Sequence, residues 1–218
     1  MKEIPDSHPR AASLRTRNKI VDGVKKGITS THGLIAQGRG EAFDYLIGEK
    51  TTNSAKKAIC ASAAMLLLAK HPVLSINGNV CVLTPKEIVS LSKAVPCIIE
   101  VNIFHSSKLR EIKIQKYLLK HGAKEVLLPK KKLIKGIDHN RSFCNPDGIY
   151  RSDVVFVPLE DGDRCKALRN MKKKVITIDL NPLSRTAKTA NITIRTIFFT
   201  IFLPVHVNSD QTVNLASF

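Results

Sequence analysis

The sequence is poor in aromatic residues: its 218 residues include three tyrosines, eight phenylalanines and no tryptophan. Proteins that bind single-stranded nucleic acids usually stack bases on aromatic side chains that alternate with basic residues. The most basic stretch, residues 108–151, has only Tyr117, Phe143 and Tyr150 as aromatic residues. It also lacks RNP and zinc-finger signatures and a clear helix-turn-helix. We therefore expect no dedicated nucleic-acid-binding module.

Cysteine and histidine are present but not clustered. The five cysteines form no C-x-x-C pair, and the seven histidines form no H-E-x-x-H motif. Scattered, odd-numbered cysteines are typical of reduced intracellular thiols and not of a disulfide framework or a zinc site. The sequence therefore predicts a reducing compartment, a cytoplasmic location and no transition-metal centre.

Long apolar runs are also missing. Ala58–Ala69 is too short to span a bilayer, and Ile197–Val205 is shorter and contains a proline. The first fifteen residues contain no apolar core of the kind found in signal peptides. We therefore expect neither a membrane span nor a secretory signal.

Positive charge is the most prominent feature of the composition. Thirty-five Lys and Arg against 18 Asp and Glu give a formal net charge of +17. Such an excess favours a polyanionic partner, which could be a nucleic acid, an anionic membrane or phosphorylated small molecules. The densest lysine runs, Lys130–Lys132 and Lys172–Lys174, are interpreted as solvated surface.

The first part of the chain, residues 1–71, has helical periodicity. Ser7 could cap a helix that ends at Gly27, and Leu34–Ile47 is a second helix, interrupted by Gly38 and Gly40. Ala55–Ala69 is apolar nearly all round, which predicts a buried helix.

From residue 72 to residue 194, short β-branched runs alternate with helical segments. Helices are expected from Thr84 to Ala94, over Ser107–His121 and, after an acidic turn at Glu160–Asp163, through Met171. This alternation predicts a mainly parallel sheet covered on both faces. The expected strands are Val73–Ile76, Cys97–Val101, Glu125–Leu128, Val154–Val157, Lys174–Leu180 and Asn191–Ile194.

Parallel sheets bind ligands at the carboxyl ends of their strands, so the loops at residues 77–79, 102–105, 158–163 and 179–189 deserve inspection. In the last loop, Asp179 could accept from a ribose hydroxyl and Asn181 could hold a base or a hydroxyl. Ser184, Arg185 and Thr186 supply donors suited to phosphate. A capped turn with a solvated arginine explains the same residues equally well.

Three other groups have two interpretations each. Arg39, between two glycines, could reach a phosphate, or it could pair with Glu41 or Asp44 on a packed helix. The run Asn77-Gly78-Asn79 could form an anion-binding nest or a tight turn. Asp161 and Asp163 could hold Mg²⁺ or an amine, or they could belong to a solvated turn before a helix.

Taken together, five stretches of the sequence resemble the archaeal 4-phosphopantoate–β-alanine ligase family, also called phosphopantothenate synthetases. They occur in the family's order across nearly the whole chain up to residue 190. The stretches are IPDSHPR (Ile4–Arg10), GLIAQGRGEAFDYLIGEKT (Gly33–Thr51), SINGNV (Ser75–Val80), VPLEDGDR (Val157–Arg164) and IDLNPLSRTAKTA (Ile178–Ala190).

The resemblance implies an enzyme of coenzyme A biosynthesis that joins 4-phosphopantoate to β-alanine through a phosphopantoyl adenylate. ATP is the second substrate and is cleaved to AMP and diphosphate, with Mg²⁺ as the expected metal. The implied fold is a Rossmann-like three-layer α/β/α arrangement with a helical N-terminal portion, and the implied assembly is a homodimer. ATP contacts carry over to Arg17, Arg39, Asp179, Leu180, Asn181, Arg185 and Thr186.

Of these residues, Arg39 and Arg185 are expected to stabilise charge that develops on the phosphates, and no catalytic nucleophile is required. The sequence assigns no metal ligands. From the local patterns alone, the expected contacts to phosphopantoate or the amine are Asn77, Gly78, Asn79, Asp161 and Asp163.

The resemblance ends near residue 194, which divides the chain into a ligase domain (1–194) and an atypical tail (195–218). Where the family continues with Asp-Asn and a final helix, this chain has Ile197 and Phe198. The tail is interpreted as divergent or frame-shifted. Two other hypotheses are a basic α/β nucleic-acid-binding protein and a catalytically impaired ligase homologue.

Overall fold

The computed structural model describes residues 4–48, 50–195, 206–207 and 213–214. The helices are α1 (Ala11–Lys25), α2 (Thr31–Ile47), α3 (Asn53–Leu67), α4 (Gly78–Leu83), α5 (Pro85–Ala94), α6 (Lys108–Lys120), α7 (Gly162–Asn170) and α8 (Arg185–Thr189), with short helical turns η1 (Asn140–Ser142) and η2 (Pro146–Tyr150). The strands are β1 (Pro72–Ile76), β2 (Ile98–Val101), β3 (Lys132–Leu133), β4 (Phe143–Cys144), β5 (Val154–Pro158), β6 (Lys174–Ile178), β7 (Ile192–Ile194), β8 (His206–Val207) and β9 (Val213–Asn214).

Five of these strands form one parallel sheet in the order β2-β1-β5-β6-β7. The sheet grows from β1 in both directions, because β1 pairs with β2 on one side and with β5 on the other. This reversal of strand order is typical of doubly wound folds, and the sheet confirms the predicted parallel α/β architecture.

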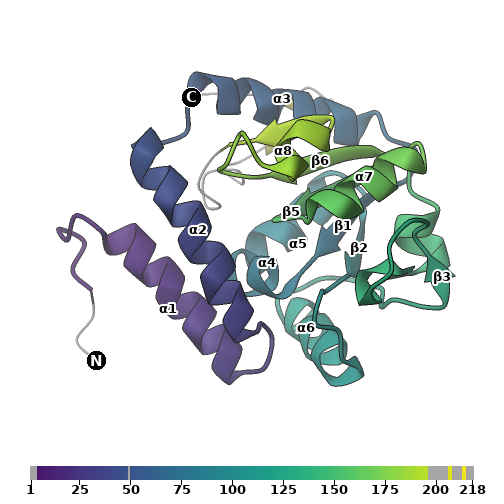
Figure 1. The fold of residues 1–218 in the computed structure, drawn as a ribbon, viewed down its shortest axis with the longest axis horizontal. Coiled ribbons are helices and arrows are strands. Elements are labelled where there is room, and N and C mark those ends of the chain that lie inside the picture. Colours follow the sequence, from purple (N-terminus) through teal and green to yellow (C-terminus); the bar gives the residue numbers. More distant parts are fainter. Residues whose placement is uncertain (1–3, 49, 196–205, 208–212, 215–218) are drawn as a thin grey trace.

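Side chains of the central strands alternate between two cores. On β5, Val154 and Phe156 pack into a core shared with α1 and α3–α6, whereas Val155 and Val157 pack against α7 and the segment that contains Ile149. Both faces of the sheet are therefore covered, as the apolar strand sequences require. The arrangement confirms the predicted three layers (Figure 1).

The helices α1 and α2 form an antiparallel pair at one side of the sheet, and α1 also packs on α4 (Figure 1). Gly33 allows a close approach between α2 and α4, since a Cβ atom there would lie 2.2 Å from Oδ1 of Asn79. The predicted helical N-terminal portion is thus confirmed, and it is built onto the α/β part.

Two predicted helices differ from the expectation. The glycines Gly38 and Gly40 do not interrupt α2, which is continuous from Thr31 to Ile47. The helix α3 is buried only along one stripe, and Leu68 at its end is 85% exposed, because only one of its sides packs on the molecule. The prediction of a buried helix therefore holds for one side of α3 only.

Two further segments were assigned incorrectly. Glu125–Leu128 does not form a strand of the sheet but makes a single bridge, between Leu127 and Glu100 of β2. Asn77-Gly78-Asn79 forms neither a nest nor an isolated turn, because Asn77 caps the short helix α4 through a hydrogen bond from Val80 N to its Oδ1 (3.1 Å).

In the tail, the short strands β8 and β9 pair in antiparallel fashion. Ile197 and Phe198, on which the predicted divergence rests, lie outside the described residues. Within the described part of the chain, no helix has the length and apolar character needed to cross a membrane. The five cysteines are free thiols.

Candidate functional site

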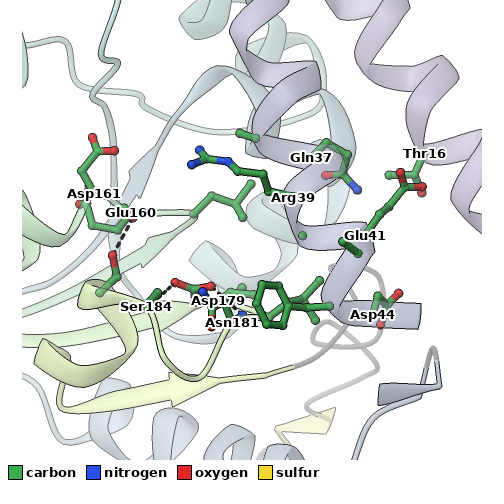
Figure 2. A pocket seen from close by; sticks show the side chains of 18 of the residues that line it. Thr16, Gln37, Arg39, Glu41, Asp44, Glu160, Asp161, Asp179, Asn181 and Ser184 are labelled. Carbon is green, nitrogen blue, oxygen red and sulfur yellow. Dashed lines mark hydrogen bonds between the residues drawn. The ribbon is translucent and has the colours of Figure 1, made fainter. Parts of the chain in front are cut away.

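A cavity of about 710 Å³ lies at the carboxyl ends of β5 and β6 and is walled on the other side by α1 and α2 (Figure 2). The lining residues on the sheet side lie in the segments 159–163 and 178–181, which begin at the ends of β5 and β6. On the other side, most residues between 36 and 44 of α2 line the cavity. The strand-end loops at residues 158–163 and 179–189 and the glycine-flanked Arg39 therefore meet around one space, although they are far apart in the sequence.

The loop after β6 is organised by hydrogen bonds before any ligand binds. Asp179 Oδ1 accepts from the backbone N–H of Asn181 (2.9 Å), and its Oδ2 accepts from the hydroxyl of Ser184. Ser184 Oγ also accepts from Ala187 N (2.9 Å) and so caps α8. Asp179, Leu180 and Asn181 all line the cavity. The capped-turn and ligand-loop interpretations are thus compatible.

Arg39 is the exposed arginine that lines the cavity. Figure 2 shows its side chain extending from α2 toward the side of the cavity where Glu160 and Asp161 lie. Among the described residues, its guanidinium makes no hydrogen bond or ion pair, so it does not pair with Glu41 or Asp44 as the alternative interpretation proposed. An unpaired guanidinium at the edge of a cavity is available to an anionic ligand.

The other two predicted arginines already have acidic partners. Arg17 pairs with Glu41 through Nε (2.9 Å) and Nη2 (2.8 Å), and this hydrogen bonding raises the pKa of Arg17. Glu41 lines the cavity but Arg17 does not. Arg185 pairs with Asp163 (2.6 Å), and both side chains are about 65% exposed. Arg185 therefore stands at the rim, whereas Asp163 lines the cavity.

Thr186, the neighbour of Arg185, is buried and lines the cavity. Its hydroxyl donates to the carbonyl oxygen of Glu160 (2.9 Å), and the Arg185 stem packs against Gly162, where a Cβ atom would lie 2.7 Å away. These contacts hold α8 against the loop after β5, and they therefore hold the loops after β5 and β6 together.

The cavity lining does not include Asn77, Gly78 or Asn79, which instead support neighbouring segments of the protein. Asn77 Nδ2 donates to the carbonyl oxygens of Pro158 (3.0 Å) and Leu159 (3.2 Å). Asn79 Oδ1 accepts from the Thr29 hydroxyl (2.6 Å), and its Nδ2 donates to Gly33 O (2.9 Å). Their side chains are engaged within the protein, so this geometry does not support the predicted substrate contacts.

Sequence reasoning missed a buried ionic network behind the loop after β5. Arg141 Nη1 lies 2.8 Å from Glu160 and 2.6 Å from Asp161, and Glu160 also pairs with Arg164. The side chains of Glu160 and Arg164 are fully buried, and Arg141 is 3% exposed. The i,i+4 spacing of Glu160 and Arg164 could have signalled their pair, but nothing near Arg141 in the sequence does so.

The cavity lining includes the carboxylates of Glu41, Asp44, Glu160, Asp161, Asp163 and Asp179. Across the described ranges, no group of three or more His, Cys, Asp or Glu side chains gathers in a way that could hold a metal ion. Asp161 and Asp163 line the cavity, and each pairs with an arginine.

The doubly wound parallel sheet with a cavity at its strand ends places the chain in the class of Rossmann-like α/β proteins that bind ligands at this edge. Within that class, the family model described as "Phosphopantothenate/pantothenate synthetase" matches residues 54–198. The chain therefore belongs to the phosphopantothenate/pantothenate synthetase family, which confirms the resemblance found in its motifs.

Curated relatives agree with this assignment. The chain is 54% identical to the 4-phosphopantoate–β-alanine ligase of Methanosarcina mazei over 194 residues, which cover 89% of this chain and 77% of the relative. It is 51% identical to the ligase of the same name from Thermococcus kodakarensis, and the match covers 89% of this chain and 75% of that relative. The chain is 52% identical to the ligase of the same name from Methanospirillum hungatei. That match covers 87% of this chain and 77% of the relative.

Proposed function

We propose that the protein is an ATP-dependent ligase that joins 4-phosphopantoate and β-alanine to give 4′-phosphopantothenate, AMP and diphosphate in coenzyme A biosynthesis. Family membership and the activity named for the relatives support this ligation. The observation that carries the ATP site is the unpaired Arg39, which extends into a cavity opposite the preorganised Asp179 loop.

In the proposed reaction, the carboxylate of 4-phosphopantoate attacks the α-phosphorus of ATP and diphosphate leaves. The amine of β-alanine then attacks the acyl carbon of the adenylate, AMP leaves and the amine loses a proton. The carboxylate substrate is itself the first nucleophile, so the protein contributes mainly positioning and charge stabilisation.

The residue roles follow from their places around the cavity. Arg39 binds the phosphates and stabilises charge on the departing diphosphate, with Arg185 assisting from the rim. Asp179 accepts from a ribose hydroxyl, and Leu180, Asn181 and Thr186 complete the nucleotide contacts. Arg17 reaches ATP only by exchanging its partner Glu41 for the nucleotide, because the two are now paired.

Mg²⁺ is proposed as the accompanying metal. It is usually held by one or two protein carboxylates together with water and substrate phosphates, and the half-exposed or exposed carboxylates of Asp161 and Asp163 fit that requirement. When bound, Mg²⁺ would neutralise phosphate charge. The ion would then compete with Arg141 and Arg185 for these two side chains.

The test is AMP formation that requires both 4-phosphopantoate and β-alanine. We expect Arg39→Ala to lower the rate of AMP formation by about 100-fold or more, in line with the loss of one preorganised charge-stabilising donor. Arg39→Lys should keep part of the rate, and Arg151→Ala, an exposed arginine outside the cavity, is the matched control. A parental rate for Arg39→Ala at limiting ATP would refute the role of Arg39.

The alternative hypotheses give different results in the same assay. A catalytically impaired homologue would bind ATP without forming AMP. A nucleic-acid-binding protein would form no AMP and would bind RNA tightly in a salt-sensitive way. A homodimer, a cytoplasmic location and a ligase domain over residues 1–194 remain part of the proposal.

A further inference from the structure

Glu41 is a buried carboxylate in the wall of the cavity. Figure 2 shows its side chain on the α1 side of the cavity, next to Thr16, and both residues line that space. Oε1 of Glu41 accepts a hydrogen bond from the Ser13 hydroxyl (2.6 Å), and Oε2 accepts one from Nε of Arg17 (2.9 Å). Burial makes an ionised carboxylate costly unless a cation and further donors compensate it. Glu41 therefore depends on Ser13 and Arg17 to keep its negative charge.

The ion pair of Arg17 and Glu41 is unequal. The side chain of Arg17 is 41% exposed and that of Glu41 is 8% exposed, and of the two only Glu41 lines the cavity. If the guanidinium turns away, water can solvate it, whereas Glu41 stays buried. Removing one partner of a buried pair leaves an uncompensated charge, which is strongly unfavourable. Any event that draws Arg17 away therefore creates a demand for another cation at Glu41.

The proposed reaction supplies such an event. The triphosphate of ATP carries more negative charge than one carboxylate and offers several acceptor oxygens to a guanidinium, so Arg17 can exchange Glu41 for the nucleotide. The ammonium group of β-alanine is a cation that the same reaction brings into the cavity. An ammonium group has three N–H donors and no acceptor, which suits the two oxygens of Glu41.

Glu41 differs from the carboxylates on the opposite wall of the cavity. Glu160 is held by two buried arginines, and Asp179 accepts hydrogen bonds from within its own loop. The side chains of Asp161 and Asp163 are 46% and 65% exposed, so water can compensate them if their arginines leave. Compared with these four, Glu41 alone is both buried and paired with an arginine that a nucleotide can draw away.

We propose that Glu41 binds the ammonium group of β-alanine and that ATP opens this site by drawing Arg17 away. β-Alanine then binds after the nucleotide, and each ligand strengthens the binding of the other. This inference rests on the proposed ligase function, because that function supplies both ligands. The Asp179 loop lines the same cavity as Glu41, so the amine enters the space in which the adenylate forms.

The test measures β-alanine binding by calorimetry, with and without a non-hydrolysable ATP analogue and Mg²⁺. The analogue should strengthen β-alanine binding to the parental protein by about 10-fold or more, within the usual range of coupling between two sites. Glu41→Gln keeps the size of the side chain but removes its charge. With the analogue present, this substitution should weaken β-alanine binding by about 10-fold or more, as expected for the loss of a charged hydrogen bond.

Two further measurements separate an ammonium contact from a structural effect. Glu41→Gln should bind the analogue at least as tightly as the parental protein does, because Arg17 no longer leaves a charged partner. Arg17→Gln should bind β-alanine without the analogue about 10-fold more tightly than the parental protein does, because its Glu41 is open from the start. Asp22→Asn, which removes an exposed acid of α1 outside the cavity, is the matched control and should keep the parental affinities.

Three results would overturn the proposal. The first is a parental affinity for β-alanine in Glu41→Gln, and the second is an equal weakening of β-alanine and the analogue in that variant. The third is a loss of β-alanine binding in Asp44→Asn but not in Glu41→Gln, which would place the ammonium group on the next acid along α2.

The assay of AMP formation keeps this proposal distinct from the ligase function. AMP formation that requires both 4-phosphopantoate and β-alanine, together with unchanged β-alanine binding in Glu41→Gln, would remove the ammonium site and leave the ligase in place. Coupled binding of the analogue and β-alanine that is lost in Glu41→Gln, in a parental protein that forms no AMP, would support the site and remove the ligase.

Discussion

At the scale of single residues, the glycines of α2 differ in what surrounds them. A Cβ atom at Gly38 would meet nothing within 4 Å, whereas one at Gly33 would lie 2.2 Å from Asn79 Oδ1. Neither glycine has a positive φ. Gly38 therefore weakens the helix without serving packing, while Gly33 is required by the neighbouring α4. The sequence could not distinguish them, because the difference depends on a residue 46 positions away.

We predict that Gly38→Ala raises the free energy of unfolding by about 0.5–1 kcal/mol, because alanine favours a helix interior over glycine. Gly33→Ala should lower it by about 1–3 kcal/mol, because the added methyl group collides with the buried hydrogen-bonded pair of Thr29 and Asn79. Denaturant unfolding of both variants checks this. Equal effects of the two substitutions would contradict the packing argument.

Arginine pairing shows the limit of sequence reasoning at this scale. The motif resemblance placed Arg17, Arg39 and Arg185 together as ATP contacts, yet among the described residues only Arg39 of the three has no acidic partner. Charge type can be read from the sequence, but the partner of a long side chain depends on which acids the fold brings within its reach.

At the scale of elements, one buried carboxylate on β2 holds the loop segment at residues 145–149 in place by hydrogen bonds. Glu100 accepts from the backbone N–H groups of Asn145 (2.8 Å) and Ile149 (2.6 Å). Gly148 is required there, because a Cβ atom would lie 2.0 Å from Glu100 Oε2. The sequence predicts a strand over Glu125–Leu128. That segment makes only the bridge to Glu100, so β2 remains the edge strand.

Glu100 predicts a dependence of stability on pH. Burial raises its pKa from 4.5 to about 7, despite the opposing backbone hydrogen bonds. The folded protein therefore binds the proton more tightly than the unfolded chain does. The contribution of Glu100 to stability should fall as the pH rises from about 5 to 7, and change little above that.

The matched variant is Glu100→Gln, which cannot titrate. The unfolding free energy of the parental protein relative to Glu100→Gln should decrease by roughly 2–3 kcal/mol between pH 5 and pH 7. Urea unfolding at several pH values measures this difference. A difference that is constant or increases with pH would show that Glu100 is ionised in the folded protein throughout this range.

At the scale of the whole molecule, the charge of +17 has separate origins. Lys130–Lys132 is exposed, as predicted for solvated surface. Lys172–Lys174 is not entirely so, because Lys173 is buried and its Nζ donates to the carbonyl oxygens of Tyr150 (2.8 Å) and Ser152 (2.7 Å). Burial lowers the pKa of Lys173. Part of the excess is thus structural, and part is solvated surface.

We expect this surface to bind RNA only weakly, with a dissociation constant of about 1 µM or weaker at physiological salt, as for non-specific electrostatic binding. Filter binding of a labelled single-stranded RNA at increasing salt tests this. An excess of the RNA should not inhibit AMP formation. Submicromolar binding that persists in salt and competes with ATP would favour the nucleic-acid-binding hypothesis instead.

The architecture and the family could be predicted from the order of residues alone. Alternating apolar strands and capped helices specify a parallel sheet because each segment's periodicity matches only one way of burying its apolar side chains. The motifs after β5 and β6 also identified the sheet edge where the cavity lies. These features are local, so the order of residues along the chain is sufficient to predict them.

The tertiary structure alone decided which polar side chains remain free for a ligand. It engaged Asn77 and Asn79 in supporting hydrogen bonds and buried Arg141 and Arg164 around Glu160. It also left Arg39 without a partner in the described part of the chain and brought three histidines together at the end of β2. Each outcome depends on contacts between segments remote in sequence. Hydrogen bonds and ion pairs act over a few ångströms, so only the folded chain determines which of them form.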